Sequence, residues 1–164
     1  MGWMLHGLAP IEIAPERQSF VIPAQNAALR GRFLAPAAPR LEVKTGFPVE
    51  PVNRYSTNPV PRDNYFPEWI LYATPAKPAA SEEFLAAMQI QRLGKSPEPA
   101  ATIESAPAEN GRGLKLMCGA STHWIVLRGE GAGPTRAGQL STDGQLAAAE
   151  IAADNTVRRA LAIQ

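Results

Sequence analysis

One long stretch, residues 45–74, is dense in proline and aromatic side chains and constrains the fold more than any other part of the chain. Proline fixes its own φ and has no backbone N–H, so it interrupts helices and interior strands alike. The residue before each proline is also pushed to extended geometry. We therefore predict a long, extended, proline-rich loop that ends in a strand over 68–74; loops of this length are usually functional or pinned to a neighbour. Its prolines are Pro48, Pro51, Pro59, Pro61 and Pro67.

The composition favours strands and narrows the classes of partner. Sixteen prolines and thirteen glycines among 164 residues indicate many short elements joined by turns. An apolar fraction of 45% is enough for a hydrophobic core. The formal net charge of +1 argues against a basic nucleic-acid surface, and no apolar run approaches the roughly 20 residues of a membrane helix. We expect a single domain over 1–164, with neither nucleic acid nor membrane as its partner.

Apolar and polar residues alternate over many short segments, which is the pattern of half-buried strands. Leu29 and Phe33, for example, share one face of a strand over 28–34, with Gly31 between them on the same face. We predict an all-β chain folded as a two-layer antiparallel β-sandwich, with an irregular loop over 94–113. Further strands are expected over 3–8, 19–22, 41–45, 69–73, 102–104, 113–118 and 122–128.

Segment 81–94 carries signals for both helix and strand. Ser81 suits a helix N-cap and Gly94 suits the residue that follows a helix. In contrast, polar and apolar residues alternate over 88–91, and the surrounding segments are rich in strand signals. The strand is the preferred interpretation, and the helix stays open as the alternative.

The carboxyl-terminal part of the chain is similarly ambiguous. Its alanine content suits a helix over 146–163, whereas Asp154-Asn155-Thr156 indicates a turn between two strands, 146–152 and 157–163. Both interpretations stay open. Just upstream, the dipeptide Asp143-Gly144 predicts a tight hairpin turn.

Cysteine and histidine are scarce, since the chain has one Cys and two His. Cys118 lies in an apolar run, which predicts a buried, inert thiol, and His123 nearby keeps a Cys–His pair as the alternative. His6 lies between Leu5 and Gly7 in an apolar strand and is expected to be packed and hydrogen-bonded. His123 is expected to be structural. With two histidines and no carboxylate at ligand spacing from either, we expect no metal, no cofactor and no catalytic residue.

Arginine and tyrosine recur in the proline-rich loop and at its end, and they form the best candidate for a binding surface. A guanidinium can hold a carboxylate or sulfate bidentately, and an aromatic face can stack on a sugar ring. The alternative is that these side chains are ordinary anchors against an adjoining domain. The candidate substrate-binding residues are Arg54, Tyr55, Arg62, Tyr65 and Trp69.

Short motifs between residues 3 and 90 follow one another in a distinctive order. A W-x-L-H strand at 3–7 precedes an L-x-G-x-x-L-x-P strand and turn at 29–36. The order continues with G-x-P at 46–48, Asn53, Trp69 and the Phe-Leu pair of 84–88. In this order the chain resembles the β-rich carboxyl-terminal region of heparinase II/III-like polysaccharide lyases.

The resemblance implies a fold and a role. Lyases of this family join an amino-terminal helical toroid to β-sheet domains and cleave uronic-acid polysaccharides by β-elimination, with catalytic residues in the toroid and the first sheet domain. No such catalytic motif matches here, so the resemblance implies a non-catalytic β-sandwich from the carboxyl-terminal domain of a secreted or periplasmic enzyme. Its expected partners are the catalytic toroid domain of the parent enzyme and an acidic polysaccharide.

Two further hypotheses stay open. The chain could be an independent carbohydrate-binding module, or a structural protein such as a viral capsid or tail component. Residues 1–6 lack the features of a signal peptide, and both ends of the chain have the character of strands, which leads us to expect a fragment of a larger enzyme.

Overall fold

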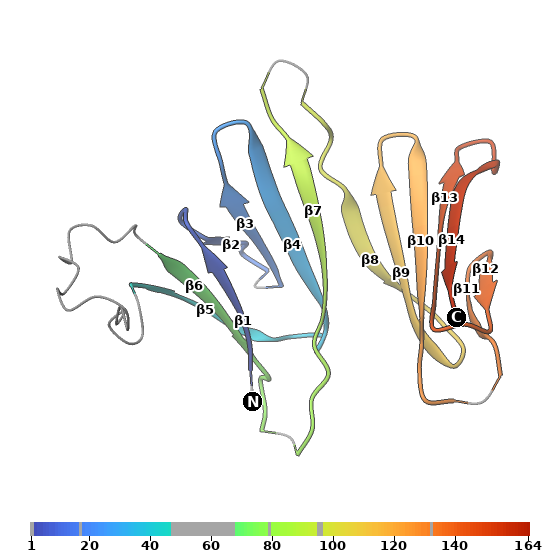
Figure 1. Cartoon of the computed structure of the whole chain (residues 1–164). Helices are drawn as coiled ribbons and strands as arrows, with labels where there is room; N and C mark the ends of the chain where they lie inside the picture. The colour runs from blue at the N-terminus through green and yellow to red at the C-terminus, as the bar shows by residue number, and fades with distance from the viewer. Residues whose placement is uncertain (1, 17, 47–67, 79, 95–96, 132) are drawn as a thin grey trace, which may run out of the picture. The chain divides into compact units, whose positions relative to one another are not determined.

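The computed structural model describes residues 2–16, 18–46, 68–78, 80–94, 97–131 and 133–164, and every regular element in these ranges is a β-strand (Figure 1). The prediction of an all-β fold is therefore confirmed. Most of the proline-rich loop, residues 47–67, lies outside the described residues. The chain divides into two compact units, Met1–Pro97 (unit 1) and Glu98–Gln164 (unit 2), and each is described by itself. The single domain expected over 1–164 stays a prediction.

Unit 1 contains two antiparallel sheets. A three-stranded sheet has the order β1-β6-β5, and a four-stranded sheet has the order β2-β3-β4-β7. The strands are β1 (Trp3–Gly7), β2 (Glu12–Ile13), β3 (Ser19–Pro23), β4 (Ala27–Ala35), β5 (Arg40–Thr45), β6 (Trp69–Thr74) and β7 (Leu85–Arg92).

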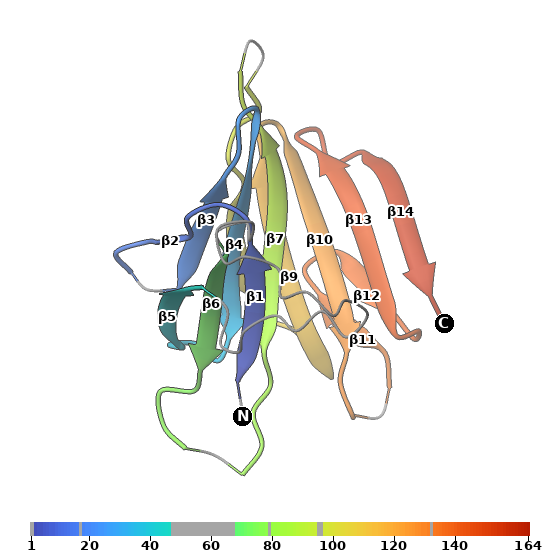
Figure 2. The same cartoon turned by 60° about the vertical axis from the view of Figure 1, so that its left-hand side comes forward.

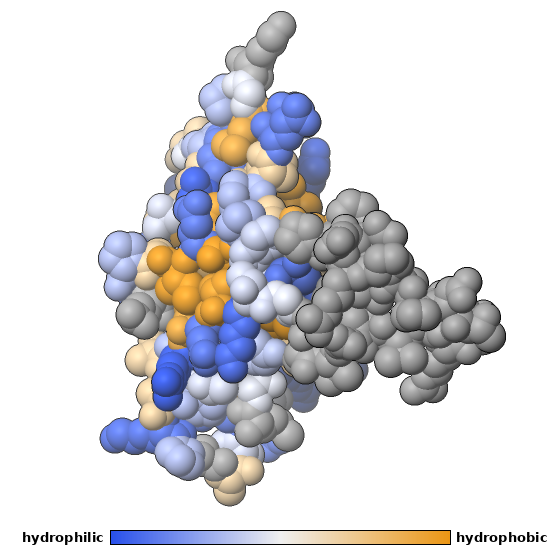
Figure 3. All heavy atoms as spheres, turned by 90° about the vertical axis from the view of Figure 1, so that its left-hand side faces the viewer, coloured by the Kyte–Doolittle hydropathy of each residue, from blue (hydrophilic) through white to orange (hydrophobic). Residues whose placement is uncertain are grey.

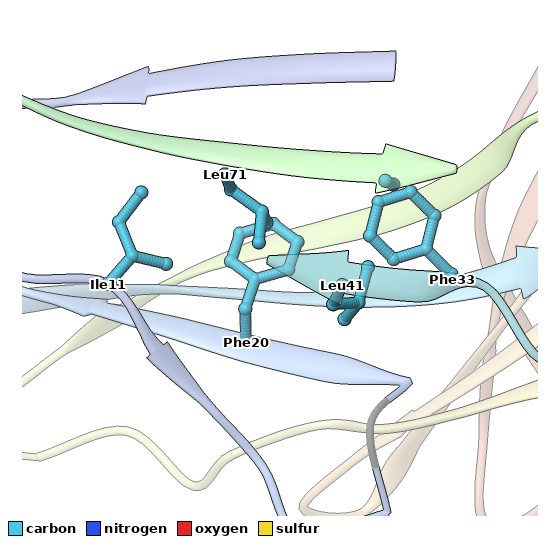
Figure 4. Close-up of a cluster of buried hydrophobic side chains, with 6 residues drawn as sticks. Ile11, Phe20, Phe33, Leu41 and Leu71 are labelled. Carbon is cyan, nitrogen blue, oxygen red and sulfur yellow. The ribbon is translucent and has the colours of Figure 1, made fainter. Parts of the chain in front are cut away.

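The core of unit 1 lies between these two sheets, which form the two layers of a β-sandwich (Figure 4). Phe20 and Phe33 come from the four-stranded sheet, while Leu71 comes from the three-stranded one, and all three are almost fully buried. The Trp3 ring meets Phe33 edge-on, with 5.1 Å between ring centroids. Gly31 provides the space for Phe20, because a Cβ at this position would lie 2.2 Å from the ring. The predicted inward face of 28–34 is thus confirmed.

The ambiguous segment 81–94 contains strand β7, and the helical alternative is wrong. β7 pairs antiparallel with β4 along almost its whole length. Met88 lies opposite Gly31 and Ile90 lies opposite Leu29. Met88 and Ile90 therefore share one face of the sheet, and Gln89 and Gln91 lie on the other face. Pairing with a neighbouring strand has overridden the local preference for helix.

Unit 2 is built on a five-stranded antiparallel sheet of order β14-β13-β10-β9-β8, accompanied by the two-stranded sheet β11-β12. Part of segment 94–113, predicted as an irregular loop, forms β8 and the start of β9, because both pair within the large sheet. The strands are β8 (Thr102–Ala106), β9 (Gly111–Cys118), β10 (Ser121–Arg128), β11 (Thr135–Ala137), β12 (Leu140–Thr142), β13 (Leu146–Ala152) and β14 (Val157–Ile163).

The last two strands settle the other ambiguous segment. β13 and β14 form an antiparallel hairpin, so the helical alternative for 146–163 is wrong and the turn at 154–156 is confirmed. The Asp154 carboxylate accepts a hydrogen bond from the backbone N–H of Thr156 at 3.0 Å. Asn155 adopts a positive φ of 65°, which asparagine tolerates better than most residues.

The tight hairpin predicted at Asp143-Gly144 is wrong. The hairpin instead joins β11 to β12 through Gly138, whose φ is +57°. Gly144 lies in a bend between two strands that do not pair, and its N–H donates to the buried Thr142 Oγ1 at 3.0 Å. A Cβ at Gly144 would lie 2.4 Å from the carbonyl oxygen of Ile163. Glycine is therefore required here by close approach to β14.

Candidate functional site on the β1–β6–β5 face

The outer face of the three-stranded sheet is formed by alternate residues whose sequence neighbours point into the core. Trp3 and Leu5 of β1 pack against the core, as do Leu71 and Ala73 of β6. The residues between them therefore point to the opposite side of the sheet. This outer face carries Met4 and His6 from β1, Glu42 and Lys44 from β5, Glu68, and, from β6, Tyr72 and the almost fully buried Ile70.

His6 and Glu68 form a polar pair at one end of the outer face. His6 lies opposite Ile70 in the β1–β6 register, and its Nδ1 contacts Oε1 of Glu68, which becomes an ion pair when the imidazole is protonated. The His6 side chain is 50% exposed, whereas that of Glu68 is only 11% exposed. Oε2 of Glu68 is buried without a hydrogen-bond partner among the described residues. The expectation that His6 is packed is thus wrong, because its strand turns it to the outer face, although the ring does have a partner.

Lys44 and Tyr72 form a second group beside this pair. The Lys44 ammonium lies over the Tyr72 ring, 5.2 Å from the ring centroid, and within 3.6 Å of a Glu42 carboxylate oxygen. Both charged side chains are more than half exposed. The side of the chain on which β1, β5 and β6 lie in Figure 1 faces the viewer in Figure 3, where hydrophobic residues gather beside hydrophilic ones. On this face Lys44 therefore contacts both an aromatic ring and a carboxylate.

The proline-rich loop leaves β5 and enters β6 at the same end of this sheet. The N–H of Gly46 donates to the carbonyl oxygen of Glu68 at 2.9 Å, continuing the β5–β6 ladder past its last residue pair, Thr45 and Trp69. The predicted site residues Arg54, Tyr55, Arg62 and Tyr65 lie outside the described residues.

Trp69 is the predicted site residue that the structure describes. It lies opposite Gly7 on the inner face of β6 and packs against the core, on the other side of the sheet from Tyr72. Its contact with a ligand stays a prediction.

The predicted site residues did not include Lys44, Glu68 or Tyr72. Alternation did hold a signal for two of them, since Glu68 and Tyr72 must point outward if Trp69 and Leu71 point inward. The proximity of Glu68 to His6 had no local signal, because the two residues are far apart in the sequence.

A shallow hollow lies on unit 2, with a volume of about 400 Å³. β10, β13 and β14 line it with apolar side chains such as Ile125 and Leu161, together with His123 and Glu150. Glu150 accepts a hydrogen bond from Ser121 Oγ at 3.1 Å and lies near two arginines of β14. Through these contacts Glu150 of β13 links this strand to both of its neighbours, β10 and β14.

Cys118 is half-buried rather than buried, and its Sγ lies 3.6 Å from the Pro99 carbonyl oxygen. No group of three His, Cys, Asp or Glu side chains that could hold a metal is found in the part of the chain that the structure describes. Within the same residues, no helix is long and apolar enough to cross a membrane.

Comparisons with protein-family models, with curated proteins and with solved structures gave no match.

Proposed function

We propose that this chain is a non-catalytic β-sandwich domain of a heparinase II/III-like polysaccharide lyase, and that it contacts acidic polysaccharide through the outer face of the β1–β6–β5 sheet. The order of sequence motifs supports the family. The observation that carries the binding role is the Lys44 ammonium positioned 5.2 Å from the centre of the Tyr72 ring. The two together offer a uronate residue both a counter-charge and an apolar surface.

The chemistry of the face suits a sugar acid. A uronate carboxylate would pair with Lys44, while the C–H groups of the sugar ring would contact the exposed part of Tyr72. Glu42 is the competing anion for Lys44, but exposed ion pairs contribute only about 0–1 kcal/mol, so a ligand carboxylate can replace it.

Calorimetric titration with uronic-acid oligosaccharides tests this proposal. We expect saturable binding that weakens about fivefold in Lys44→Ala, the loss of roughly 1 kcal/mol that one exposed cation provides. Tyr72→Ala should weaken binding by a similar factor. Neutral oligosaccharides of equal length should bind less tightly than the acidic ones.

Unit 2 offers a matched control, because Lys115 lies over the Trp124 ring at 5.8 Å. Lys115→Ala removes the same kind of cation–aromatic contact from unit 2 and should leave the affinity unchanged. An equal loss in both lysine variants would contradict the assignment of the face. Release of unsaturated uronate by the chain alone, followed by its ultraviolet absorbance, would contradict the non-catalytic role.

A further inference from the structure

The hollow on unit 2 has a polar row and an aliphatic row of side chains on its floor. Its strands β10, β13 and β14 lie side by side in the sheet (Figure 2). Glu150 of β13 lies opposite both His123 of β10 and Arg159 of β14. Two residues further along, the same face carries three aliphatic residues, Ile125, Ala148 and Leu161. The two rows are about 7 Å apart, because a strand rises about 3.4 Å per residue.

Ala148 accounts for the depth of the hollow. Its methyl group lies between two longer side chains on the neighbouring strands, Ile125 and Leu161. Leu161 is 57% exposed. The opposite face of the same strands differs, because there the Trp124 ring meets Gly138 at the turn between β11 and β12. The small residue therefore leaves a socket about one side chain wide, with an aliphatic wall on each side.

A β-bulge turns both arginines of β14 towards the polar row. The pairing passes from Arg159 to Val157 between two successive residues of β13, so Arg158 is the extra residue. Neighbouring residues of a regular strand point to opposite faces, whereas a bulge re-aims them. As a result, Arg158 Nη1 lies 3.8 Å from Glu150 Oε1, and Arg159 Nε lies 3.9 Å from Oε2.

The two carboxylate oxygens of Glu150 have different surroundings. Oε1 accepts a hydrogen bond from Ser121 Oγ at 3.1 Å and lies near Arg158. Oε2 faces Arg159 Nε at a distance that is too long for a hydrogen bond. The Arg159 side chain is 86% exposed and lines the hollow, and a guanidinium has five N–H donors. An acceptor and a group of donors of opposite charge therefore lie side by side at the polar end of the hollow.

We propose that this hollow binds a free α-amino acid with a branched aliphatic side chain. The α-ammonium donates to Glu150 Oε2, the α-carboxylate accepts from the Arg159 guanidinium, and the side chain fills the socket above Ala148. The two charged groups of the ligand share one carbon atom, so they can reach side chains on neighbouring strands, which lie about 4.8 Å apart. A volume of about 400 Å³ is sufficient for a ligand of this size.

The charges of the polar row favour a ligand that carries both signs. An anion bound to Arg159 alone would lie beside the Glu150 carboxylate, and a cation bound to Glu150 alone would lie beside a guanidinium. A neutral apolar ligand would remove water from both groups without replacing it. A peptide carries its terminal charges far apart and can place only one of them here. The existing contact between Arg159 and Glu150 is easily replaced, because exposed ion pairs are weak.

An NMR titration of the full chain with leucine tests the proposal. We expect saturable shifts of the backbone amides of Ile125, Ala148 and Leu161. 4-Methylpentanoate lacks the ammonium and 3-methylbutylamine lacks the carboxylate, so each should bind about fivefold or more weakly than leucine. Glycine keeps both charges without the side chain and should also bind more weakly. Absence of a saturable shift, or equal binding of leucine and any of these three compounds, would overturn the proposal. A leucine-containing tripeptide that bound as tightly as leucine would overturn the choice of a free amino acid.

Two pairs of variants test the placement of the ligand. Ala148→Leu fills the socket and should abolish leucine binding, whereas Ala148→Ser keeps the socket open and should retain it. Arg159→Gln should weaken binding about fivefold or more. Arg158→Gln is its control, because Arg158 contacts Glu150 from outside the lining of the hollow, and it should bind leucine as the unmodified chain does. Circular dichroism shows whether each variant is folded. Unchanged binding in folded Ala148→Leu, or an equal loss in both arginine variants, would contradict the proposal.

Discussion

The two units bury their cores in different ways. Unit 1 closes two sheets around large rings, with Phe20 and Phe33 almost fully buried between the layers. The buried apolar residues described in unit 2 are aliphatic, and alanines lie among larger side chains: Ile103, Leu114, Val126, Ala137, Ala147, Ala149, Ile151 and Ala152. Burial free energy scales with apolar area, so a buried phenylalanine of unit 1 contributes more than a buried alanine or valine of unit 2. Small side chains in turn allow the two-stranded β11–β12 sheet to approach the large sheet closely.

Both units nevertheless use glycine to seat an aromatic ring. Gly31 faces the Phe20 ring in unit 1, and Gly138 faces the Trp124 ring in unit 2, where a Cβ would lie 2.5 Å from Cη2. The two positions differ in backbone conformation, because only Gly138 has a positive φ among the pair. Gly31 is therefore required because a ring occupies the space of a Cβ, whereas Gly138 is required both for that reason and for its backbone conformation.

The largest expected effect comes from removing a core ring. Phe33→Ala should lower the free energy of unfolding by about 3–5 kcal/mol, since it deletes a buried phenyl group and leaves a cavity. Val126→Ala, at an equally buried position of unit 2, should cost about 2 kcal/mol. Urea unfolding followed by circular dichroism measures both. A larger loss in Val126→Ala would break the comparison between the two cores.

The next largest effect comes from the two glycines that face aromatic rings. Gly31→Ala and Gly138→Ala should each cost about 1–3 kcal/mol from overpacking against a ring. At Gly138 the positive φ adds a further cost of about 1–2 kcal/mol for any residue with a Cβ. Gly46→Ala is the matched control, because Gly46 has a φ of +85° but no atom of the described residues lies within 4 Å of its missing Cβ. If Gly46→Ala proved as costly as Gly138→Ala, ring contact would not be the reason for glycine.

A hydrogen bond in the bend of unit 2 gives a smaller effect. Thr142→Val keeps the shape of the side chain but leaves the buried Gly144 N–H without its acceptor, at a cost of about 1–3 kcal/mol. Thr102→Val on the exposed side of β8 should stay within about 0.5 kcal/mol of the unmodified chain. Equal stability of the two variants would show that solvent or a rearranged bend provides the Gly144 N–H with another acceptor.

The smallest effects concern two exposed turn carboxylates, one in each unit. The Ser19 hydroxyl holds the pKa of Glu16 below its ordinary value, and the Thr156 backbone N–H does the same for the pKa of Asp154. Because folding lowers both pKa values, the two carboxylates stabilise the folded chain at pH values above their ordinary pKa. This stabilisation is lost as the pH falls through the lowered pKa. Carboxyl NMR titration should place both midpoints below those of unfolded peptides.

Ser19→Ala distinguishes the cause of the lowered pKa of Glu16 from that of Asp154. It should return the pKa of Glu16 towards its ordinary value and leave that of Asp154 lowered, since the donor to Asp154 is a backbone group. An unchanged Glu16 midpoint in Ser19→Ala would remove the hydroxyl as its main cause.

Local patterns in the sequence predicted the strands well, because alternation is a property of neighbouring residues. The turn at Asp154 was predictable for the same reason: the side chain bonds its own backbone two residues on. The hairpin at Asp143-Gly144 was predicted wrongly from an equally good local signal. There the carbonyl of Ile163, distant in sequence, sets the position of Gly144, and the Trp124 ring favours glycine at the actual turn, Gly138.

The candidate site was less accessible to sequence reasoning. Its residues belong to β1, β5 and β6, and the order β1-β6-β5 brings together segments separated by the whole proline-rich loop. His6 was expected to be packed because its neighbours are apolar, yet its partner Glu68 is contributed by the far end of that loop. Such pairing depends on register between distant strands, which alternation alone does not specify.

The most direct test of the account is an NMR titration of the full chain with a uronic-acid oligosaccharide. The account predicts saturable shifts of the backbone amides of His6, Lys44 and Tyr72, with the amides of β10 and β13 unchanged. Shifts confined to unit 2, or no saturable shift at all, would contradict the claim that the outer face of the β1–β6–β5 sheet is the binding surface.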